Sequence, residues 1–213
     1  MATLMTHTTM PMLANADTLS RTQLRNELRQ RRQALTLSQQ TLAAKRLARR
    51  LLGDPTLFRA RHIGVYLPND GEIDPSLFVA QARLRGIQFY LPVLHPIHKG
   101  RLVFSPFDPD TPLRENRFGI PEPEFDDGLR RPAWALDAVL MPLVGFDSEG
   151  GRLGMGGGFY DRTFAFSRRV CDLAPKLIGL AHHSQQVDKL PIASWDIPLH
   201  AIVSDQGKYR IGH

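Results

Sequence analysis

Hydrophobic positions near the N-terminus recur at helical spacing and predict two consecutive helices. Those of the first helix are Leu24, Leu28 and Leu35, with arginines around them. Those of the second helix are Leu42, Leu47 and Leu51. Thr36 followed by Gln39 matches a capping box at the start of the second helix, and Gly53 is a natural end for it. We therefore expect two amphipathic helices that each bury a leucine face.

Short apolar runs farther along the chain predict strands. They cover residues 62–67, 87–94, 102–104, 138–144, 177–181 and 201–204. Asp74 and Pro75 have the N-cap and first-turn character of a helix start, and Gly86 would end that helix. A strand, a helix and another strand in succession favour parallel pairing through a right-handed crossover. A further helix is expected from Tyr160 to about Phe166.

These elements predict an α/β fold in which helices cover both faces of a mostly parallel sheet, a three-layer α/β/α arrangement. We expect a single domain over residues 20–213 and a disordered N-terminal extension over residues 1–19. Ligands in such folds bind beyond the carboxyl ends of the strands. The irregular, proline-rich segment 95–134 is a long surface excursion of the kind that often shapes a binding site.

The most informative segment is GFDSEGGRLGMGGGFYDR, residues 145–162, which follows the strand expected over 138–144. Five of the eight residues from Gly151 to Gly158 are glycine, and Arg152 lies among them. Glycine permits positive φ angles and lets backbone N–H groups approach a ligand closely. A strand, a glycine loop and a helix start together predict a phosphate cradle. A glycine cluster alone is also compatible with an ordinary turn.

Two common nucleotide motifs do not fit this loop. A Walker loop needs a Gly-Lys-Ser/Thr sequence, and the segment has no lysine. The dinucleotide fingerprint needs Gly or Ala three residues after Gly156, where Phe159 stands. The segment instead resembles the RLGxGxGxYD signature of the 5-formyltetrahydrofolate cyclo-ligase family, also called methenyltetrahydrofolate synthetases. The resemblance runs from about Arg21 to Ser204, through four separated segments in the family order.

The composition excludes several other classes of protein. A chain of 213 residues is long enough for one domain with a substantial core. It has no apolar run of the length that spans a membrane, and its first twenty residues lack the pattern of a signal peptide. The single cysteine, Cys171, excludes an internal disulfide, argues against a structural zinc site and fits a cytoplasmic location.

The net charge of +6 is concentrated in one region. Residues 21–50 hold nine basic residues against Glu27, a net +8, so the rest of the chain is net −2. A basic region suits an anionic ligand or nucleic acid. A nucleic-acid-binding protein is the first alternative function, although it leaves the glycine loop without a role. A sugar-phosphate or coenzyme-A-type enzyme on a similar scaffold is the second. We expect neither nucleic acid nor a membrane as a partner.

The segment RTQLRNELRQRRQALT, residues 21–36, resembles the family's N-terminal helix, whose two basic residues contact ATP phosphates. Arg21 and Arg25 stand at those positions, one turn apart on one face. Spacing alone also fits a solvated basic face. The ATP contacts implied by the resemblance are Arg21, Arg25, Arg152, Leu153, Gly154, Met155, Gly156, Gly157, Gly158, Phe159 and Tyr160. Arg152 and Tyr160 are the candidate catalytic residues.

Glu72 lies in YLPNDGEID, which is similar to the family segment whose glutamate contacts the folate. A carboxylate suits a pterin, which presents an amino group and ring N–H donors side by side. Without the resemblance, a surface charge is the simpler interpretation of Glu72. The folate contacts implied by the resemblance are Leu67, Glu72, Met155, Gly156, Gly157, Gly158 and Phe159.

Two aspartates are candidate ligands of Mg²⁺. Asp161 follows the glycine loop, where a carboxylate can hold Mg²⁺ beside phosphate oxygens or simply stabilise a helix start. Asp196, in WDIPL, matches the second acid that the family associates with the metal. The adjacent His182 and His183 have no evident partner for acid–base chemistry, so we expect them to have a surface or strand-end role.

The loop departs from the family pattern at three positions. The family often has a second tyrosine where Phe159 stands, and a basic residue where Met155 or Gly157 stands. Arg152 is therefore the main fixed positive charge of the loop. Phe159 and Tyr160 are also compatible with a place in the core. The resemblance implies conversion of 5-formyltetrahydrofolate to 5,10-methenyltetrahydrofolate with ATP as co-substrate and Mg²⁺ as cofactor, and leaves polyglutamylation of the substrate open.

Overall fold

The computed structural model describes residues 20–124, 128–170 and 173–211. The extension expected over residues 1–19 and Cys171 lie outside these ranges. A seven-stranded sheet forms the centre, in the order β11–β10–β9–β6–β1–β2–β3. Its strands are β1 (His62–Gly64), β2 (Gln88–Leu94), β3 (Leu102–Phe107), β6 (Ala138–Pro142), β9 (Lys176–Ala181), β10 (Ala201–Ser204) and β11 (Lys208–Arg210).

The direction of the strands confirms the mostly parallel sheet. Neighbours from β10 through β2 pair in parallel. Only β3 and β11, at the two edges, pair antiparallel with their neighbours. Two small hairpins accompany the sheet: β4 (Leu113–Glu115) with β5 (Pro121–Pro123), and β7 (Gly145–Phe146) with β8 (Arg152–Leu153).

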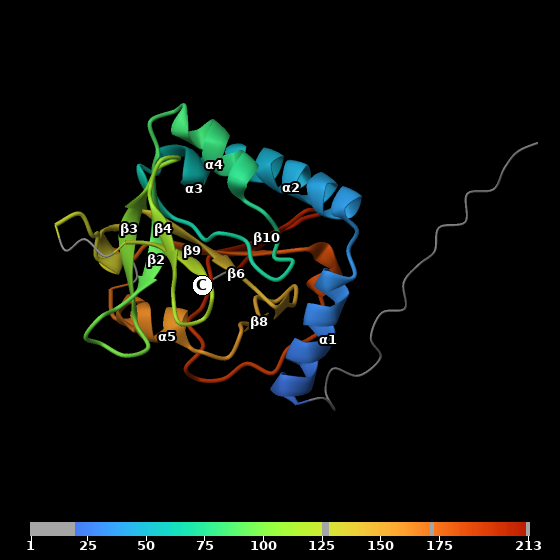
Figure 1. The fold of residues 1–213 in the computed structure, drawn as a ribbon. Helices are drawn as coiled ribbons and strands as arrows, with labels where there is room; N and C mark the ends of the chain where they lie inside the picture. The colour runs from blue at the N-terminus through green and yellow to red at the C-terminus, as the bar shows by residue number, and fades with distance from the viewer. Residues whose placement is uncertain (1–19, 125–127, 171–172, 212–213) are drawn as a thin grey trace, which may run out of the picture.

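Helices cover both faces of this sheet, as the sequence predicts. In Figure 1, α2 (Leu37–Leu52), α3 (Pro55–Arg59) and α4 (Ser76–Arg83) lie above the sheet, and α5 (Phe159–Thr163) lies below it. Helix α1 (Arg21–Gln33) stands beside the sheet and contacts η4 and β7. The short 3₁₀ turns are η2 (Ala133–Ala135), η3 (Ala165–Arg168) and η4 (His183–Gln185).

The core has two layers because side chains alternate across the central strands. In β6, Ala138 and Leu140 pack toward α2 and α4, while Val139 and Met141 pack toward the α5 side. All four are at most 2 % exposed. Because β6 is buried on both faces, these four side chains are shielded from solvent, and this explains its continuous apolar sequence.

Two of the expected leucine positions are wrong. Leu42 is 48 % exposed, because the buried face of α2 is formed instead by Ala43, Leu47 and Leu51. Leu35 lies beyond the end of α1 and is only half-buried. The capping box of α2 is confirmed: the Thr36 side chain accepts from the backbone of Gln39, whose side chain accepts in return.

Several predicted boundaries move by a few residues. The first strand ends at Gly64, although the Val65 N–H still donates to the Tyr90 carbonyl at 2.8 Å. The helix expected over 160–166 divides into the five-residue α5 and the turn η3. Helix α4 starts at Ser76 with Pro75 at its N-cap position, one residue later than expected, and the Asp74 carboxylate accepts from the Ser76 N–H at 2.8 Å. No helix among the described residues is long and apolar enough to span a bilayer.

Candidate active site

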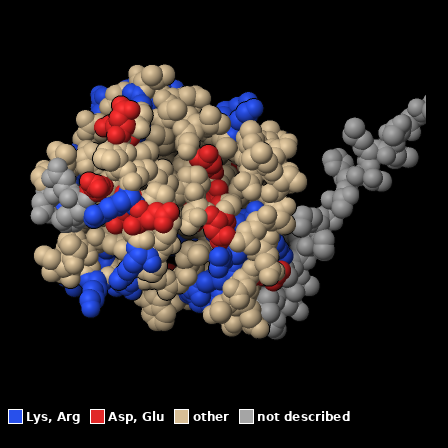
Figure 2. Space-filling view, viewed as in Figure 1, with Lys and Arg blue, Asp and Glu red and all other residues tan. Residues whose placement is uncertain are grey.

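A cavity of about 900 Å³ opens beyond the carboxyl ends of β1 and β6, the place expected for a ligand in this fold. Its walls come from α1, the turn after β1, the β4–β5 hairpin, the glycine loop and the segment before β10. Figure 2 shows the mixed charge on this face, with acidic side chains near the middle and basic side chains in the lower half.

The cavity brings together all the predicted site residues except Leu153. The lining includes Arg21, Arg25, Leu67, Glu72, Arg152, Gly154, Met155, Gly156, Gly157, Gly158, Phe159, Tyr160, Asp161 and Asp196. The Leu153 side chain is 1 % exposed and packs with Leu24, Leu28 and Val144. The whole residue is buried and its carbonyl accepts from the Val144 N–H at 2.7 Å, so Leu153 supports the loop from below the cavity surface.

The glycine loop needs its glycines for two different reasons. Gly156 and Gly158 have φ angles of +94° and +61°, which side chains with a Cβ rarely adopt. Gly151 instead leaves room for Asp147, because an added Cβ would lie 2.2 Å from the Asp147 Oδ2 atom. The buried Asp147 carboxylate accepts from the N–H groups of Gly151 at 2.7 Å and Leu190 at 2.9 Å. Gly151 thus anchors the base of the loop, and Gly156 and Gly158 shape its tip.

Helix α1 holds the loop from the other side. The Arg25 Nε donates to the Gly154 carbonyl at 2.8 Å. Burial lowers the pKa of Arg25, and the nearby Arg21 lowers it further, while Asp196 opposes the shift. The helix that follows the loop, α5, has only five residues, so its dipole adds little to an anion site. The loop N–H groups and the arginines are the main positive elements of this wall.

Each of the two predicted metal-binding acids is paired with an arginine. Arg152, which is 9 % exposed, donates to the Asp161 Oδ1 atom, and the Ile197 N–H donates to the same oxygen at 3.0 Å. Arg21 donates to both oxygens of Asp196, at 2.9 and 3.2 Å. Burial lowers the pKa of Arg152, while Asp161 and Asp196 oppose that shift. The cavity wall therefore alternates two cations with two anions.

Glu72 lines the cavity from the turn after β1. Its side chain is only 11 % exposed, and its Oε2 atom accepts from the Asn69 N–H at 3.2 Å. Burial raises the pKa of Glu72 to about 7, although the Arg32 charge and the Asn69 hydrogen bond act to lower it. The surface-charge interpretation of Glu72 is therefore wrong, since a surface carboxylate keeps its ordinary pKa.

The aromatic pair of the loop serves both the core and the cavity. Tyr160 lines the cavity and stacks on Phe164 with ring centroids 6.4 Å apart. Burial and the nearby Glu72 raise the pKa of Tyr160, so its hydroxyl stays protonated at neutral pH. Phe159 lines the cavity and meets the edge of Phe118 from the β4–β5 hairpin at 5.9 Å.

Comparisons with known proteins show the family of this chain. A family model described as the 5-formyltetrahydrofolate cyclo-ligase family matches residues 17–205. The chain belongs to the 5-formyltetrahydrofolate cyclo-ligase family. It is 42 % identical over 177 residues to the 5-formyltetrahydrofolate cyclo-ligase of Escherichia coli K12, covering 83 % of this chain and 96 % of that protein. It is 40 % identical over 187 residues to the 5-formyltetrahydrofolate cyclo-ligase of Haemophilus influenzae, covering 88 % of this chain and 98 % of that protein.

A solved structure also resembles this one. The NMR structure of Aquifex aeolicus 5,10-methenyltetrahydrofolate synthetase has a TM-score of 0.74 at 25 % identity, covering 90 % of this chain and 92 % of that chain. The resemblance that the glycine loop carries is therefore confirmed at the level of family and fold. The protein is an enzyme of the cyclo-ligase family.

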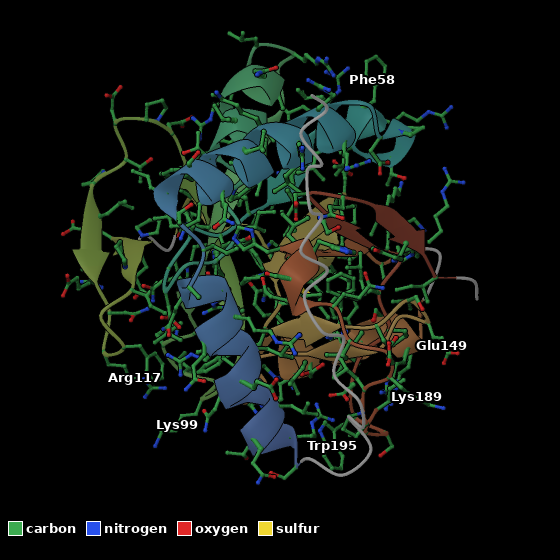
Figure 3. The ribbon with its side chains drawn as sticks, turned by 90° about the vertical axis from the view of Figure 1, so that its right-hand side faces the viewer. Phe58, Lys99, Arg117, Glu149, Lys189 and Trp195 are labelled. Carbon is green, nitrogen blue, oxygen red and sulfur yellow. The ribbon has the colours of Figure 1, made fainter. Side chains whose placement is uncertain are left out.

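Several cavity residues of this cyclo-ligase were missed by sequence reasoning, among them Arg32, Phe118 and Trp195. Arg32 lies seven residues after Arg25, an offset that returns to the same helix face, so a signal was present. Phe118 and Trp195 also line the cavity, but isolated aromatics in irregular segments carry no local pattern. Figure 3 shows Trp195 beside the N-terminal end of α1. The segment 95–134, expected to shape a binding site, contributes its β4–β5 hairpin to the cavity lining.

Of the adjacent histidines, His182 has a structural role. His182 follows β9, is 3 % exposed, and places its Nε2 atom 3.2 Å from the Gly71 carbonyl. Burial lowers the pKa of His182, which keeps the ring neutral. The strand-end role is confirmed for His182, and its contact ties β9 to the turn that carries Glu72.

Proposed function

We propose that this cyclo-ligase converts 5-formyltetrahydrofolate to 5,10-methenyltetrahydrofolate while ATP becomes ADP and phosphate. The observation that supports this most is that one cavity is lined by two chemically different sets of groups. Its lining includes the glycine loop with Arg21, Arg25 and Arg152, and it also includes the buried Glu72 carboxylate. The first suits a polyphosphate and the second suits a pterin.

The chemistry explains why such a site needs no protein nucleophile. The oxygen of a formamide is a poor leaving group, so attack by the neighbouring N10 needs activation. Transfer of the γ-phosphoryl group to the formyl oxygen supplies that activation. N10 then attacks the formyl carbon, the five-membered ring closes, and phosphate leaves with the oxygen. The protein must align the two substrates and stabilise the negative charge that moves between them.

The phosphate side of the site would use the loop and three arginines. The N–H groups between Gly154 and Gly158 would surround the phosphates, and Arg25 would keep the loop in place through the Gly154 carbonyl. Arg152 is buried, so its charge acts in a medium of low dielectric constant, where it stabilises a phosphoryl transition state strongly. Arg21 would add a second cation. Tyr160 would complete this wall as a hydroxyl donor.

The folate side would use the turn after β1. The Glu72 carboxylate would accept from the pterin amino group and ring N–H, and Leu67 would pack against the pterin. Met155, Gly156, Gly157, Gly158 and Phe159 line the same cavity, where both substrates would meet them.

Asp161 and Asp196 would hold Mg²⁺. Within residues 20–124, 128–170 and 173–211 there is no cluster of three metal-ligating side chains. That fits Mg²⁺ with ATP, because this ion commonly takes one or two carboxylates and completes its shell with phosphate oxygens and water. The ion would neutralise phosphate charge. Both carboxylates are already paired with arginines, so they would form part of a shared network of charges.

The decisive test is absorbance in the methenyl-folate band with purified protein, 5-formyltetrahydrofolate and MgATP. We expect absorbance to grow only when both substrates are present, and ADP to form in equal amount. Glu72→Gln should weaken folate binding and leave ATP affinity nearly intact, because the amide offers one acceptor and one competing donor to the pterin. Binding of nucleic acid without ATP turnover would favour the alternative function of the basic region.

A further inference from the structure

Arg32 is a fully buried charge beside Glu72. Its side chain is 0 % exposed, an unusual position for an arginine. The Nε atom donates to the Asp70 carbonyl and the Nη2 atom to the Asp70 carboxylate, both at 2.8 Å. The Nη1 atom is buried and has no hydrogen-bond partner among the described residues. It lies 3.8 Å from the Glu72 Oε1 atom.

The turn that carries both acids is shaped around this guanidinium. Asp70 has a φ angle of +51°, the one positive value among the described non-glycine residues. Such a conformation is uncommon outside glycine and persists where the surroundings hold it. Arg29, Arg32 and Gln33 of α1 all bind the Asp70 carboxylate. Helix α1 therefore sets the geometry of the turn from which Glu72 projects into the cavity.

We propose that Arg32 is a positioning residue for folate recognition, whose Nη1 group orients the Glu72 carboxylate and favours its ionised form. This rests on the proposed folate role of Glu72. A buried arginine with an unpaired N–H is costly unless that donor has a use. A carboxylate 3.8 Å away is within reach of a small rotation, so pterin binding that moves Glu72 toward Arg32 would complete the pair.

Other charged groups near Glu72 do not duplicate this role. Asp70, on the same turn, raises the pKa of Glu72 through its like charge. Tyr66 and Tyr160 face Glu72, and burial raises the pKa of each hydroxyl, so both stay neutral. His182 is near Arg32 and neutral at pH 7, since burial lowers its pKa. Among the groups that act on Glu72, Arg32 alone is a cation.

The test is a titration of the Glu72 carboxyl carbon by NMR in protein labelled at the glutamate side-chain carboxyl, without substrate. The pKa of Glu72 in the wild-type protein should lie at about 7. In Arg32→Met it should rise toward roughly 8–9, the range of buried unpaired glutamates. Arg29→Met is the matched control, because Arg29 binds Asp70 at 2.9 Å yet makes no ion pair with Glu72. It should leave the Glu72 titration close to wild type.

Kinetics test the consequence for folate. In Arg32→Met the KM for 5-formyltetrahydrofolate at pH 7 should rise roughly 5- to 50-fold, because a pKa of about 8–9 leaves only about 1–9 % of the Glu72 carboxyl ionised against about half in wild type, and it should move toward the wild-type value near pH 9. The KM for ATP should hold. Arg32→Lys, which keeps the charge, should restore much of the folate affinity. A loss of affinity that is the same at both pH values would mean a merely structural role and would overturn the proposal.

A second variant covers the case in which Arg32→Met does not fold. Asp70→Asn removes the like charge and keeps a residue that tolerates positive φ, so the pKa of Glu72 should fall below its wild-type value. An unchanged Glu72 titration in Arg32→Met contradicts the proposal, and an unchanged titration in Asp70→Asn overturns its premise that the charges of this turn act on Glu72. If instead the titrations shift as expected but Glu72→Gln leaves the folate KM unchanged, Arg32 acts on Glu72 and the folate role of Glu72 is what fails.

Discussion

Arg21 at the start of α1 and Asp196 in the segment before β10 are 175 residues apart in sequence and joined by two hydrogen bonds of 2.9 and 3.2 Å. Burial raises the pKa of Asp196, but the bonds from Arg21 and from the Ala193 N–H outweigh it, so the pKa falls below its ordinary value. Asp196 is thus charged throughout the neutral range. It can hold Arg21 toward the phosphates as well as contribute to a metal site.

Replacing each acid by asparagine separates these two tasks. Asp161→Asn should raise the Mg²⁺ concentration for half-maximal activity by roughly tenfold, within the range of disturbed metal sites. Asp196→Asn should give a smaller shift and raise the KM for ATP even at saturating Mg²⁺, because Arg21 loses its partner. A magnesium titration of both variants checks this. Unshifted curves in both would remove the two acids from any metal site.

Gly156→Val should abolish ATP binding and leave a cooperative thermal transition. The φ angle of +94° disfavours a β-branched residue, and a side chain there would point at the Arg25 guanidinium, 3.4 Å from the Cβ position. Gly86→Val is the matched control, since Gly86 has a φ angle of +80° but lies outside the cavity. Calorimetry with ATP compares them. Equal ATP affinity in both variants would mean that the loop serves only the fold.

Features that depend on neighbouring residues could be predicted from the sequence. The capping box of α2 and the glycine loop after β6 were found because a few adjacent residues determine their backbone. The site at the strand ends followed from the parallel topology. Leucine spacing placed Leu42 wrongly in the buried face of α2, because alanines occupy most of that face. Their small side chains let α2 approach α4 and β10 closely.

The features of the site that could not be predicted depend on contacts between segments that are distant in the sequence. Nothing local indicates that Asp196 meets Arg21, or that Phe118 meets Phe159 across the cavity. Arg32 is fully buried only because the turn at Asp70 closes over it. The exposure of a charged side chain is decided by what packs against it, so a basic helix alone could not distinguish a solvated face from one that faces a cavity.

Arg152→Ala should reduce turnover by about 10²–10³-fold at saturating ATP, the usual cost of losing a charge-stabilising donor. It also leaves Asp161 without its arginine, so a lower melting temperature is expected. Arg83→Ala is the control for losing an arginine ion pair, because Arg83 pairs with Asp108 and lies outside the cavity. Steady-state kinetics of the two variants test the catalytic role of Arg152. Near-wild-type turnover of Arg152→Ala would contradict that role.

Glu72→Gln should stabilise the protein while it weakens folate binding. Burial raises the pKa of Glu72 in the folded state to about 7 from an ordinary value of 4.5, so folding favours its protonated form. The stability gained from protonation is complete below about pH 4.5 and is lost as the pH rises through about 7. A neutral glutamine avoids that loss.

The variant should therefore match wild type near pH 4 and exceed it near pH 8. The pKa difference of 2.5 units corresponds to at most about 3 kcal/mol, because each unit is worth about 1.4 kcal/mol. For a chain of this size, each kcal/mol raises the melting temperature by roughly 2–4 °C. Melting curves at the two pH values measure the effect. An offset independent of pH would show that Glu72 is not held in a site that resists its charge, and the folate role proposed for it would lose its electrostatic basis.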